Sequence, residues 1–198
     1  WRLSRYRHGP GVFKMDWALK APVPWRASDC RRTGTLHLGG SFAEIAVSER
    51  AAWDGRKCDR PYVLVTQPSL FDPTRAPPGK HTLWAYCHVP NGSTVDVHAA
   101  IERQIERYAP GFRDCIEETH VMSPADLERS NANLVGGDLG GGAADLAQIY
   151  TRPIASVNPY RTSIPNVFLC SSSTPPGMGV HGMSGYHAAR AAMKTIRA

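Results

Sequence analysis

The regular alternation of side chains from Val12 to Leu19 most constrains how this sequence can fold. Phe13, Met15 and Trp17 share one face of an extended chain, and the residues between them share the other. A period of two is that of a β-strand with one buried face. The proline-containing stretch 21–24 then ends the strand, because proline donates no hydrogen bond to a sheet ladder. The fold must therefore contain a sheet that buries at least one face.

Further strands and helices follow without a regular order. Short apolar segments bounded by glycine or proline predict strands over residues 33–38, 61–66, 81–89, 115–121 and 166–170. Capping residues and alanine-rich composition predict helices that begin at Ser41, Ser93, Ser123 and Met183. This order predicts an α+β fold in which helices flank a mixed or antiparallel sheet. The final strand, loop and helix look like a different kind of unit.

Two of the helix starts rest on capping boxes, in which a serine and an acidic residue three positions later bond to each other's backbone N–H groups. Ser41 precedes Glu44 at this spacing, and Ser93 precedes Asp96. After Ser93, apolar residues recur at helical spacing at Val97, Ile101, Ile105 and Tyr108. The sequence therefore predicts an amphipathic helix that begins at Ser93.

Length and composition are those of a globular domain. The 198 residues are 42% hydrophobic and 20% charged, which is enough to build a core. No apolar run approaches the roughly 20 residues of a membrane-spanning helix, and no signal peptide is recognisable. The five cysteines are widely spaced and form no CxxC pair. We therefore expect no disulfide framework, no metal site and a reducing compartment, the cytoplasm.

The net charge of +6 raises the question of an anionic partner. The densest basic cluster runs from Trp1 to His8, where arginines alternate with aromatic residues. Such a cluster could contact nucleic acid or a lipid surface, but nucleic-acid binders carry a more extended basic face. The alternative is a solvated chain end, and on this ground we expect no nucleic-acid partner.

Two glycine-rich stretches are candidates for close approach to a ligand. Residues 136–142 contain five glycines, and residues 177–182 have the pattern GxGxxG. That pattern indicates a dinucleotide site only when a second strand and an acidic residue about 20 positions on follow it. Only 16 residues follow Gly182, and none is acidic. Two interpretations stay open: an anion or electron-rich ring at the helix start, or a tight turn before a packed helix.

The segment Phe168 to Met193, FLCSSSTPPGMGVHGMSGYHAARAAM, resembles the C-terminal flavin-facing segment of FAD-dependent oxidoreductases related to phytoene dehydrogenase. Residues 34–39, 69–81 and 150–153 resemble further stretches of that family at fitting spacing. The likeness covers essentially the whole chain and is greatest to the branch of pyridine nucleotide-disulfide oxidoreductase domain proteins. One departure is Met178, where the family loop commonly has a glycine.

The resemblance implies an FAD domain that is discontinuous in sequence. Residues 1–155 would be an α+β substrate domain, and residues 156–198 would return to a Rossmann-like FAD domain that is otherwise missing. We therefore expect a C-terminal fragment that is inactive alone and binds FAD weakly or not at all. Its partner would be the N-terminal half of the FAD domain. The docking face left exposed would also allow a dimer of the fragment.

The resemblance also implies which residues face the cofactor. Ser172 would lie near the ribityl and pyrophosphate part of FAD. The flavin ring would lie near the helix start, at Gly179, Val180, His181, Gly182 and Met183. His181 is the one candidate catalytic side chain, and the alternative is that only its backbone matters.

Lys14 and Asp16 share the polar face of the first strand. They are candidates for lining a substrate cavity opposite the flavin, and the alternative is a solvated strand face. The resemblance implies hydride transfer from an apolar substrate C–H to the flavin, with the protein orienting the reactants. The alternative function is a non-catalytic binding or scaffold module of the same fold. A lipid substrate would place the protein at a membrane surface.

Overall fold

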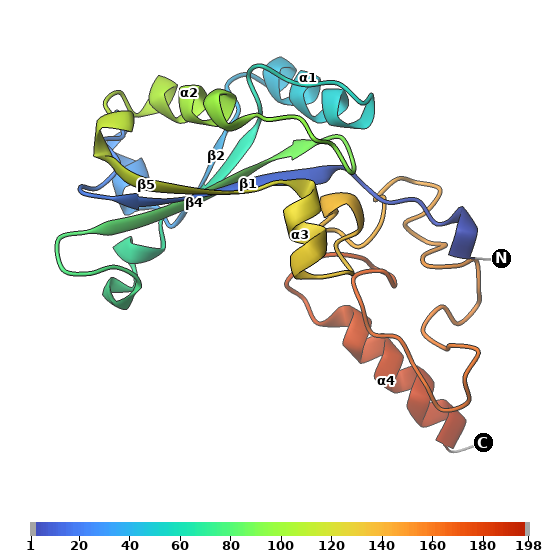
Figure 1. Ribbon diagram of the computed structural model, residues 1–198. Helices are drawn as coiled ribbons and strands as arrows, with labels where there is room; N and C mark the ends of the chain where they lie inside the picture. The colour runs from blue at the N-terminus through green and yellow to red at the C-terminus, as the bar shows by residue number, and fades with distance from the viewer. Residues whose placement is uncertain (1–2, 197–198) are drawn as a thin grey trace.

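Within residues 3–196, which the computed structural model describes, five strands form one sheet. They are β1 (Gly11–Leu19), β2 (Thr35–Leu38), β3 (Val63–Thr66), β4 (His81–Val89) and β5 (Ile116–Met122). Their order is β2-β3-β4-β1-β5, and each neighbouring pair is antiparallel. β1, which has the strictest alternation, lies between β4 and β5 (Figure 1). The α+β prediction is confirmed. Of the two predicted sheet types, mixed and antiparallel, the sheet is antiparallel.

The α-helices are α1 (Phe42–Trp53), α2 (His98–Tyr108), α3 (Pro124–Ser130) and α4 (Met183–Ile196). The capping box predicted before α1 is confirmed. The Ser41 hydroxyl accepts from the Glu44 N–H at 3.3 Å, and the Glu44 carboxylate accepts from the Ser41 N–H at 2.9 Å. Ser123 and Asp126 form the same reciprocal pair before α3. Each cap satisfies N–H groups that a helix start otherwise leaves without acceptors.

The core lies between α2 and one face of the sheet. Met15 and Trp17 on β1 are buried there, and they belong to one cluster with Ile101 and Ile105 of α2. Burying a side chain of this size contributes about 1.5–3 kcal/mol relative to leaving it exposed. Figure 1 shows α2 on one side of the sheet. The predicted apolar stripe of α2 is therefore its packing face.

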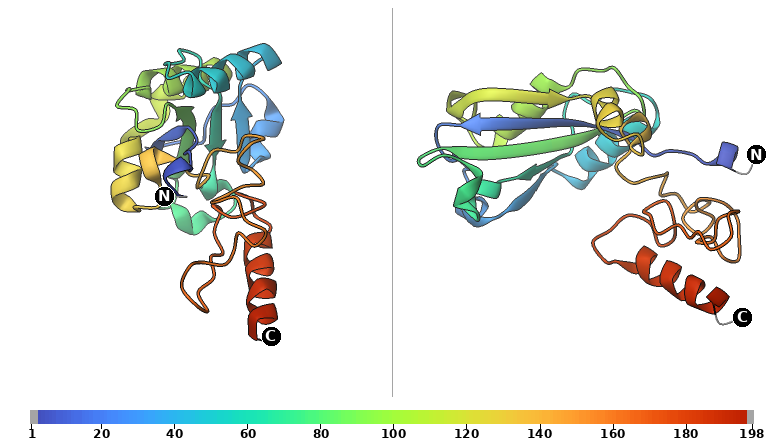
Figure 2. Two further views of the ribbon diagram at one scale, coloured as in Figure 1. Left: turned by 90° about the vertical axis from the view of Figure 1, so that its right-hand side faces the viewer. Right: turned by 60° about the horizontal axis from the view of Figure 1, so that its bottom comes forward.

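The opposite face of the sheet has no α-helix over its centre. In the right-hand view of Figure 2, the strands lie in front of α1 and α2, and α3 lies at one end of β1. The short 3₁₀ turn Pro68–Leu70 packs against β4 near the other end. We call this the open face and define it by residues that alternate with the buried ones: Lys14, Asp16, Leu64, Thr66, Trp84, Tyr86 and His120.

The predicted start of α2 at Ser93 is wrong. The helix begins at His98, and Val97 is its N-cap. The Ser93 hydroxyl accepts instead from the Val95 N–H at 3.0 Å, and the Asp96 carboxylate accepts from the His98 N–H at 2.8 Å. Both side chains therefore stabilise turns that precede the helix, since serine and aspartate favour such local bonds wherever the backbone allows them.

The strand predicted over residues 166–170 is also wrong. That region forms only an isolated bridge between Arg161 and Phe168, and Asn166 has a left-handed backbone with φ of 61°. A strand needs a neighbour that pairs with its N–H and C=O groups along its length. No described strand lies beside this segment, so the predicted Rossmann-like strand, loop and helix reduce here to a loop and α4.

Residues 131–182 have little regular structure. Apart from the 3₁₀ turn Val135–Gly137 and the isolated bridge, they form turns and loops that connect α3 to α4 (Figure 1). None of the helices in the described residues combines the length and the apolar character needed to cross a membrane. Trp1 and Arg2 of the predicted basic cluster lie outside the described residues.

Candidate functional site

Lys14 and Asp16 lie on the open face, as the alternation of β1 predicts. Lys14 Nζ donates to the Asp16 carboxylate, and the same ammonium lies 5.8 Å from the centre of the Trp84 ring. A cation at that distance from an indole face gains a cation–π attraction of about 0.5–1 kcal/mol at a partly exposed position. The two charges therefore neutralise each other on an aromatic surface, which lowers the cost of covering them.

The open face carries aromatic side chains that the sequence analysis did not single out. The rings of Trp84 and Tyr86 lie nearly parallel, with an interplanar angle of 9° and centres 6.2 Å apart. Desolvation, and then the nearby Glu49 carboxylate, raise the pKa of Tyr86 above its ordinary value of 10.0. This phenol therefore stays protonated, and the two parallel rings form an aromatic pair on the open face.

A polar cluster borders this surface near α1. His88 Nδ1 lies 2.7 Å from Glu49 on α1, and His37 Nδ1 bonds to the Tyr62 hydroxyl. The Tyr86 and His88 rings are 6.0 Å apart, so the cluster continues the aromatic row. The open face thus has polar side chains at its border and aromatic rings at its centre.

The predicted flavin-facing loop is on the surface. Val180, His181 and Gly182 are exposed, and α4 begins directly after them. The Met183 N–H donates to His181 Nδ1 at 3.0 Å, so the imidazole caps its own helix. This bond fixes the ring beside the loop and leaves Nε2 as its second polar atom. The structure thus gives the His181 side chain a local structural role, and it tests neither of the two functional alternatives.

The start of α4 is slim and accessible. A methyl group added at Gly182, where φ is +64°, or at Gly185 would meet no atom within 4 Å. The N–H groups of Ser184 and Gly185 bond to no acceptor among the described residues. Because the first-turn N–H groups of a helix carry partial positive charge, this end suits an anion or an electron-rich ring edge.

Ser172 lies apart from that loop, beside the first glycine-rich stretch. A methyl group at Gly141 would come within 2.4 Å of the Ser172 hydroxyl. The neighbouring Ser173 hydroxyl donates to the Gly141 carbonyl at 2.8 Å. The backbone of residues 136–142 is thus approached closely by side chains of the chain itself, and its approach to a ligand stays a prediction.

Arg152 is the centre of this glycine-rich region, and no local sequence pattern indicates that it is buried. Its side chain is 1% exposed. Its Nη2 donates to the carbonyls of Gly140 at 3.1 Å, Gly141 at 3.2 Å and Gly142 at 3.4 Å. A methyl group at Gly177 would meet the Arg152 guanidinium at 2.9 Å. One cation therefore links the glycine-rich stretch to the loop that precedes α4.

Asp138 adds an anion to this network. Its buried carboxylate accepts from the backbone N–H groups of Gly9 at 2.8 Å and of Gly140 and Gly142 at 2.7 Å each. Charge-assisted bonds of this kind are roughly twice as strong as neutral ones. They tie the segment that leads into β1 to the glycine-rich stretch.

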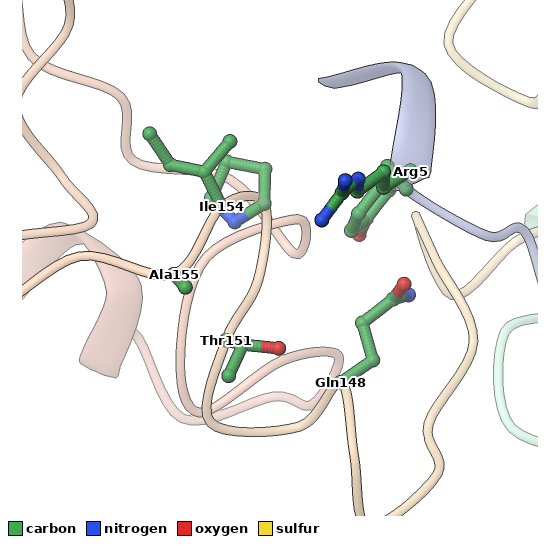
Figure 3. A pocket seen from close by; sticks show the side chains of 7 residues that line it. Arg5, Gln148, Thr151, Ile154 and Ala155 are labelled. Atoms are coloured by element: carbon green, nitrogen blue, oxygen red, sulfur yellow. The ribbon is translucent and has the colours of Figure 1, made fainter. Parts of the chain in front are cut away.

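A pocket of about 410 Å³ opens next to this network, and none of the sequence-predicted site residues lines it. Figure 3 shows Arg5 and Gln148 on one side of it and Ile154 and Ala155 on the other. The Gln148 amide is committed to the chain, because Nε2 donates to the Arg7 carbonyl at 2.7 Å and Oε1 accepts from the Arg7 N–H at 2.9 Å. The polar wall of this pocket is therefore part of the internal packing.

The predicted residues form two groups. Lys14 and Asp16 lie on the open face, while Gly179 to Met183 lie at the start of α4, and no hydrogen bond within residues 3–196 joins the groups. Figure 1 shows α4 on the side of the sheet opposite α2, which is the side of the open face. Both groups thus lie on the side of the sheet opposite α2.

Comparison with known proteins places this arrangement in a family. No family model matches the chain. The "Pyridine nucleotide-disulfide oxidoreductase domain-containing protein 2" of Mus musculus is 32% identical over 155 residues, 72% of this chain and 26% of the mouse protein. The phytoene dehydrogenase of Streptomyces griseus is 29% identical over 188 residues, 80% of this chain and 35% of that protein. This chain belongs to the family of oxidoreductases related to phytoene dehydrogenase.

A third member, the 4,4'-diapolycopen-4-al dehydrogenase of Metabacillus indicus, is 30% identical over 127 residues, 61% of this chain. The matches cover 25% to 35% of the length of the three relatives. The names of all three describe oxidoreductases or dehydrogenases, which agrees with the family inferred from the residues.

Proposed function

We propose that the protein containing this chain is an FAD-dependent dehydrogenase or oxidase that removes hydride from an activated C–H group of an apolar substrate. The two-sided sheet carries the proposal. One face packs against α2, and the open face carries Trp84 and Tyr86, with α1 at its border through the bond between Glu49 and His88. An aromatic pair beside a mutually neutralised Lys14–Asp16 pair suits an apolar molecule. Family membership supplies the reaction class.

The residues at the start of α4 fit the ring edge of a flavin. The N–H groups of Ser184 and Gly185 lack acceptors among the described residues, and Gly182 leaves open space beside them. Such donors stabilise negative charge that develops on a bound ring. When bound, FAD supplies the hydride acceptor of the reaction. Within residues 3–196 we find no strand–turn–helix that could hold its adenosine diphosphate half.

In this proposal the chain's own residues bind, orient and exclude water. Trp84 and Tyr86 hold the substrate, and the Lys14–Asp16 pair borders it without leaving a net charge on the face. His181 holds the loop and the helix start in register through its bond to Met183. No side chain of the open face has to take up the substrate proton, because hydride and proton chemistry in such reactions depends largely on the cofactor and solvent.

We further propose that the N-terminal half of an FAD domain packs against the C-terminal region. Large apolar side chains are exposed there, including Leu146 at 90%, Tyr150 at 80% and Val157 fully. Monomeric proteins rarely leave many such side chains in contact with water, so a covering surface is expected. In its absence the same side chains would favour self-association of the isolated chain.

The test compares this chain with a longer protein that also carries the sequence preceding it in the gene. Each is mixed with FAD, desalted and examined by visible absorption. We expect a colourless chain and a yellow longer protein that an apolar substrate bleaches under anaerobic conditions. A folded longer protein that retains no flavin would refute the proposal and favour the scaffold function. Flavin retained by the isolated chain would refute the proposed need for a second half.

Two matched substitutions test the proposed flavin contact. Gly182→Ala and Gly55→Ala each place a methyl group at a left-handed position, with φ of 64° and 72°, and in open space. Both cost about 1 kcal/mol of backbone strain, but only residue 182 lies at the start of α4. Weaker flavin retention in the first variant alone supports the contact, and equal retention in both would contradict it.

A further inference from the structure

A cationic cavity of about 640 Å³ lies beside α2, away from the open face and from α4. It is lined by Asp59, Arg60, Arg103, Gln104 and Arg107. Arg103, Gln104 and Arg107 come from successive turns of α2, and the other two come from the loop between α1 and β3. The cavity therefore has three guanidinium groups and one carboxylate in its lining.

Two of the arginines are held in place by a carboxylate behind them. Arg107 Nη1 donates to Glu44 Oε1 at 2.9 Å, and Arg60 Nη1 lies 3.7 Å from the same oxygen. The bond from Arg107, followed by the Ser41 backbone N–H, lowers the pKa of Glu44 from 4.5 to about 2. Glu44 is thus ionised at neutral pH, and it positions both guanidinium groups without filling their remaining donor sites, because each guanidinium has five N–H groups.

The third arginine and the glutamine lack partners. Arg103 makes no hydrogen bond or ion pair to any residue between 3 and 196. Gln104 is 3% exposed, and its Nε2 is buried without a hydrogen-bond partner. A buried amide without a partner is costly, and native structures keep few of them. The amide offers both a donor and an acceptor, and rotation about its last side-chain bond lets either one face the cavity that Gln104 lines.

We propose that Arg60, Arg103, Arg107 and Gln104 form a binding site for a phosphate group. Guanidinium groups donate paired bonds to phosphate oxygens, and a phosphate monoester offers three such oxygens and close to two negative charges. Asp59 in the lining and Glu44 beside it repel an anion, but the three arginines still leave a net charge of +1. The cavity is many times larger than the roughly 30 Å³ of one water, so the group that carries the phosphate fits as well.

This site is independent of the proposed flavin chemistry, since it shares no residue with the open face or with α4. A phosphate group of this kind occurs both in soluble phosphate compounds and in the headgroups of lipids. The exposed apolar side chains of Phe42 and Val47 on α1 make the second source worth a separate arm of the test.

In the first arm, pyrophosphate is titrated into the protein by calorimetry at low salt. In the second arm, the protein is sedimented with phosphatidylcholine vesicles that contain or lack phosphatidate. Arg103→Gln removes an exposed cation that has no partner in the fold, and Arg161→Gln is a matched loss of charge at an exposed site in the loops before α4. We expect Arg103→Gln to weaken binding about tenfold and Arg161→Gln to change it less than twofold.

Gln104→Leu separates a binding role from a structural one. Because the amide is buried without a partner, its removal should leave the thermal midpoint unchanged or raise it, yet weaken phosphate binding severalfold. Saturable pyrophosphate binding without vesicle binding assigns a soluble source, and phosphatidate-dependent sedimentation that Arg103→Gln abolishes assigns a lipid. Absence of both, or equal losses in Arg103→Gln and Arg161→Gln, overturns the proposal.

Discussion

Substitution of Arg152 by methionine tests whether a buried cation organises the irregular part of the chain. Arg152 forms no ion pair with any described residue, and its Nε is buried without a partner. Burying an unpaired charge costs several kcal/mol, so its net contribution could have either sign. The bonds from Nη2 to the glycine carbonyls decide the sign.

The magnitude follows from the donors. Nη2 has two hydrogens, so it makes at most two good bonds to the three carbonyls, each worth about 1.5–3 kcal/mol because the donor is charged. Arg152→Met also leaves the Gly140 and Gly142 carbonyls without this donor, at about 1–3 kcal/mol each, while the Gly141 carbonyl keeps its bond from the Ser173 hydroxyl. After subtracting the relief of the buried charge, we expect a net local loss of about 2–4 kcal/mol.

The assay has to observe the loops directly. Every described tryptophan lies between residues 17 and 84, so tryptophan fluorescence reports only the sheet unit. Hydrogen exchange followed by mass spectrometry covers peptides from residues 136–143 and 171–177. A loss of about 2–4 kcal/mol corresponds to about 30- to 700-fold faster exchange there when opening is at equilibrium. We expect the urea transition seen by tryptophan fluorescence to stay unchanged.

Arg26→Met is the control, because Arg26 is exposed and its side chain makes no bond to a described residue. Arg152→Lys should recover part of the protection, since an ammonium retains the charge and three donors but reaches fewer carbonyls. Unchanged exchange in Arg152→Met, or slower exchange, would refute the reasoning and show that the fold merely tolerates this cation.

Three further predictions follow from the caps, the carboxylates and the thiols. Ser123→Ala should lower the free energy of unfolding by about 1 kcal/mol, because the hydroxyl caps α3. Ser93→Ala should lower it less, because this hydroxyl supports only a turn. Equal losses in urea denaturation would show that Ser93 also acts as a helix cap. Arg107 and the Ser41 N–H lower the pKa of Glu44 to about 2, so its stabilisation is complete above pH 4.5 and is lost as the pH falls toward 2. Glu44→Gln should flatten the stability–pH curve in that window, and an unchanged curve would contradict this. Burial raises the pKa of the Cys87 thiol, whereas Cys170 is exposed. A thiol reagent should therefore modify Cys170 first and Cys87 only when the protein unfolds. Equal rates of modification of the two cysteines in the folded protein would contradict this prediction.

The sheet could be predicted because its signals are local and repeated. β1 alternates over its whole length, and the serine–acid pairs before α1 and α3 form the reciprocal bonds that their spacing predicts. At Ser93 the same spacing occurs, yet the helix begins later. Serine and aspartate cap turns as readily as helices, and the choice depends on where the apolar stripe meets the sheet.

Long-range features could not be read in this way. The segment 166–170 has the composition of a strand, but a strand forms only beside a partner, and the sequence does not say which partner is present. In β4, both faces carry apolar or aromatic residues, so the sequence does not tell which face α2 covers. Arg152 and Gln104 are of residue types that usually lie on the surface. Arg152 is buried by contacts with Tyr6, with the carbonyls of residues 140–142 and with Gly177, and no local sequence pattern indicates these contacts.

The two halves of the chain are stabilised by different interactions, apolar burial in the first and polar bonds in the second. Residues 11–130 bury large side chains between α2 and the sheet, whereas residues 131–182 depend on polar bonds centred on Arg152 and Asp138. α4 buries only small side chains, Ser184, Ala188 and Ala191, and it exposes Tyr186, Met193 and Ile196. Burying small side chains contributes little, and a helix of 14 residues is marginal without packing. A second surface over its apolar side would supply the missing burial, which is the physical reason to expect that α4 completes another domain.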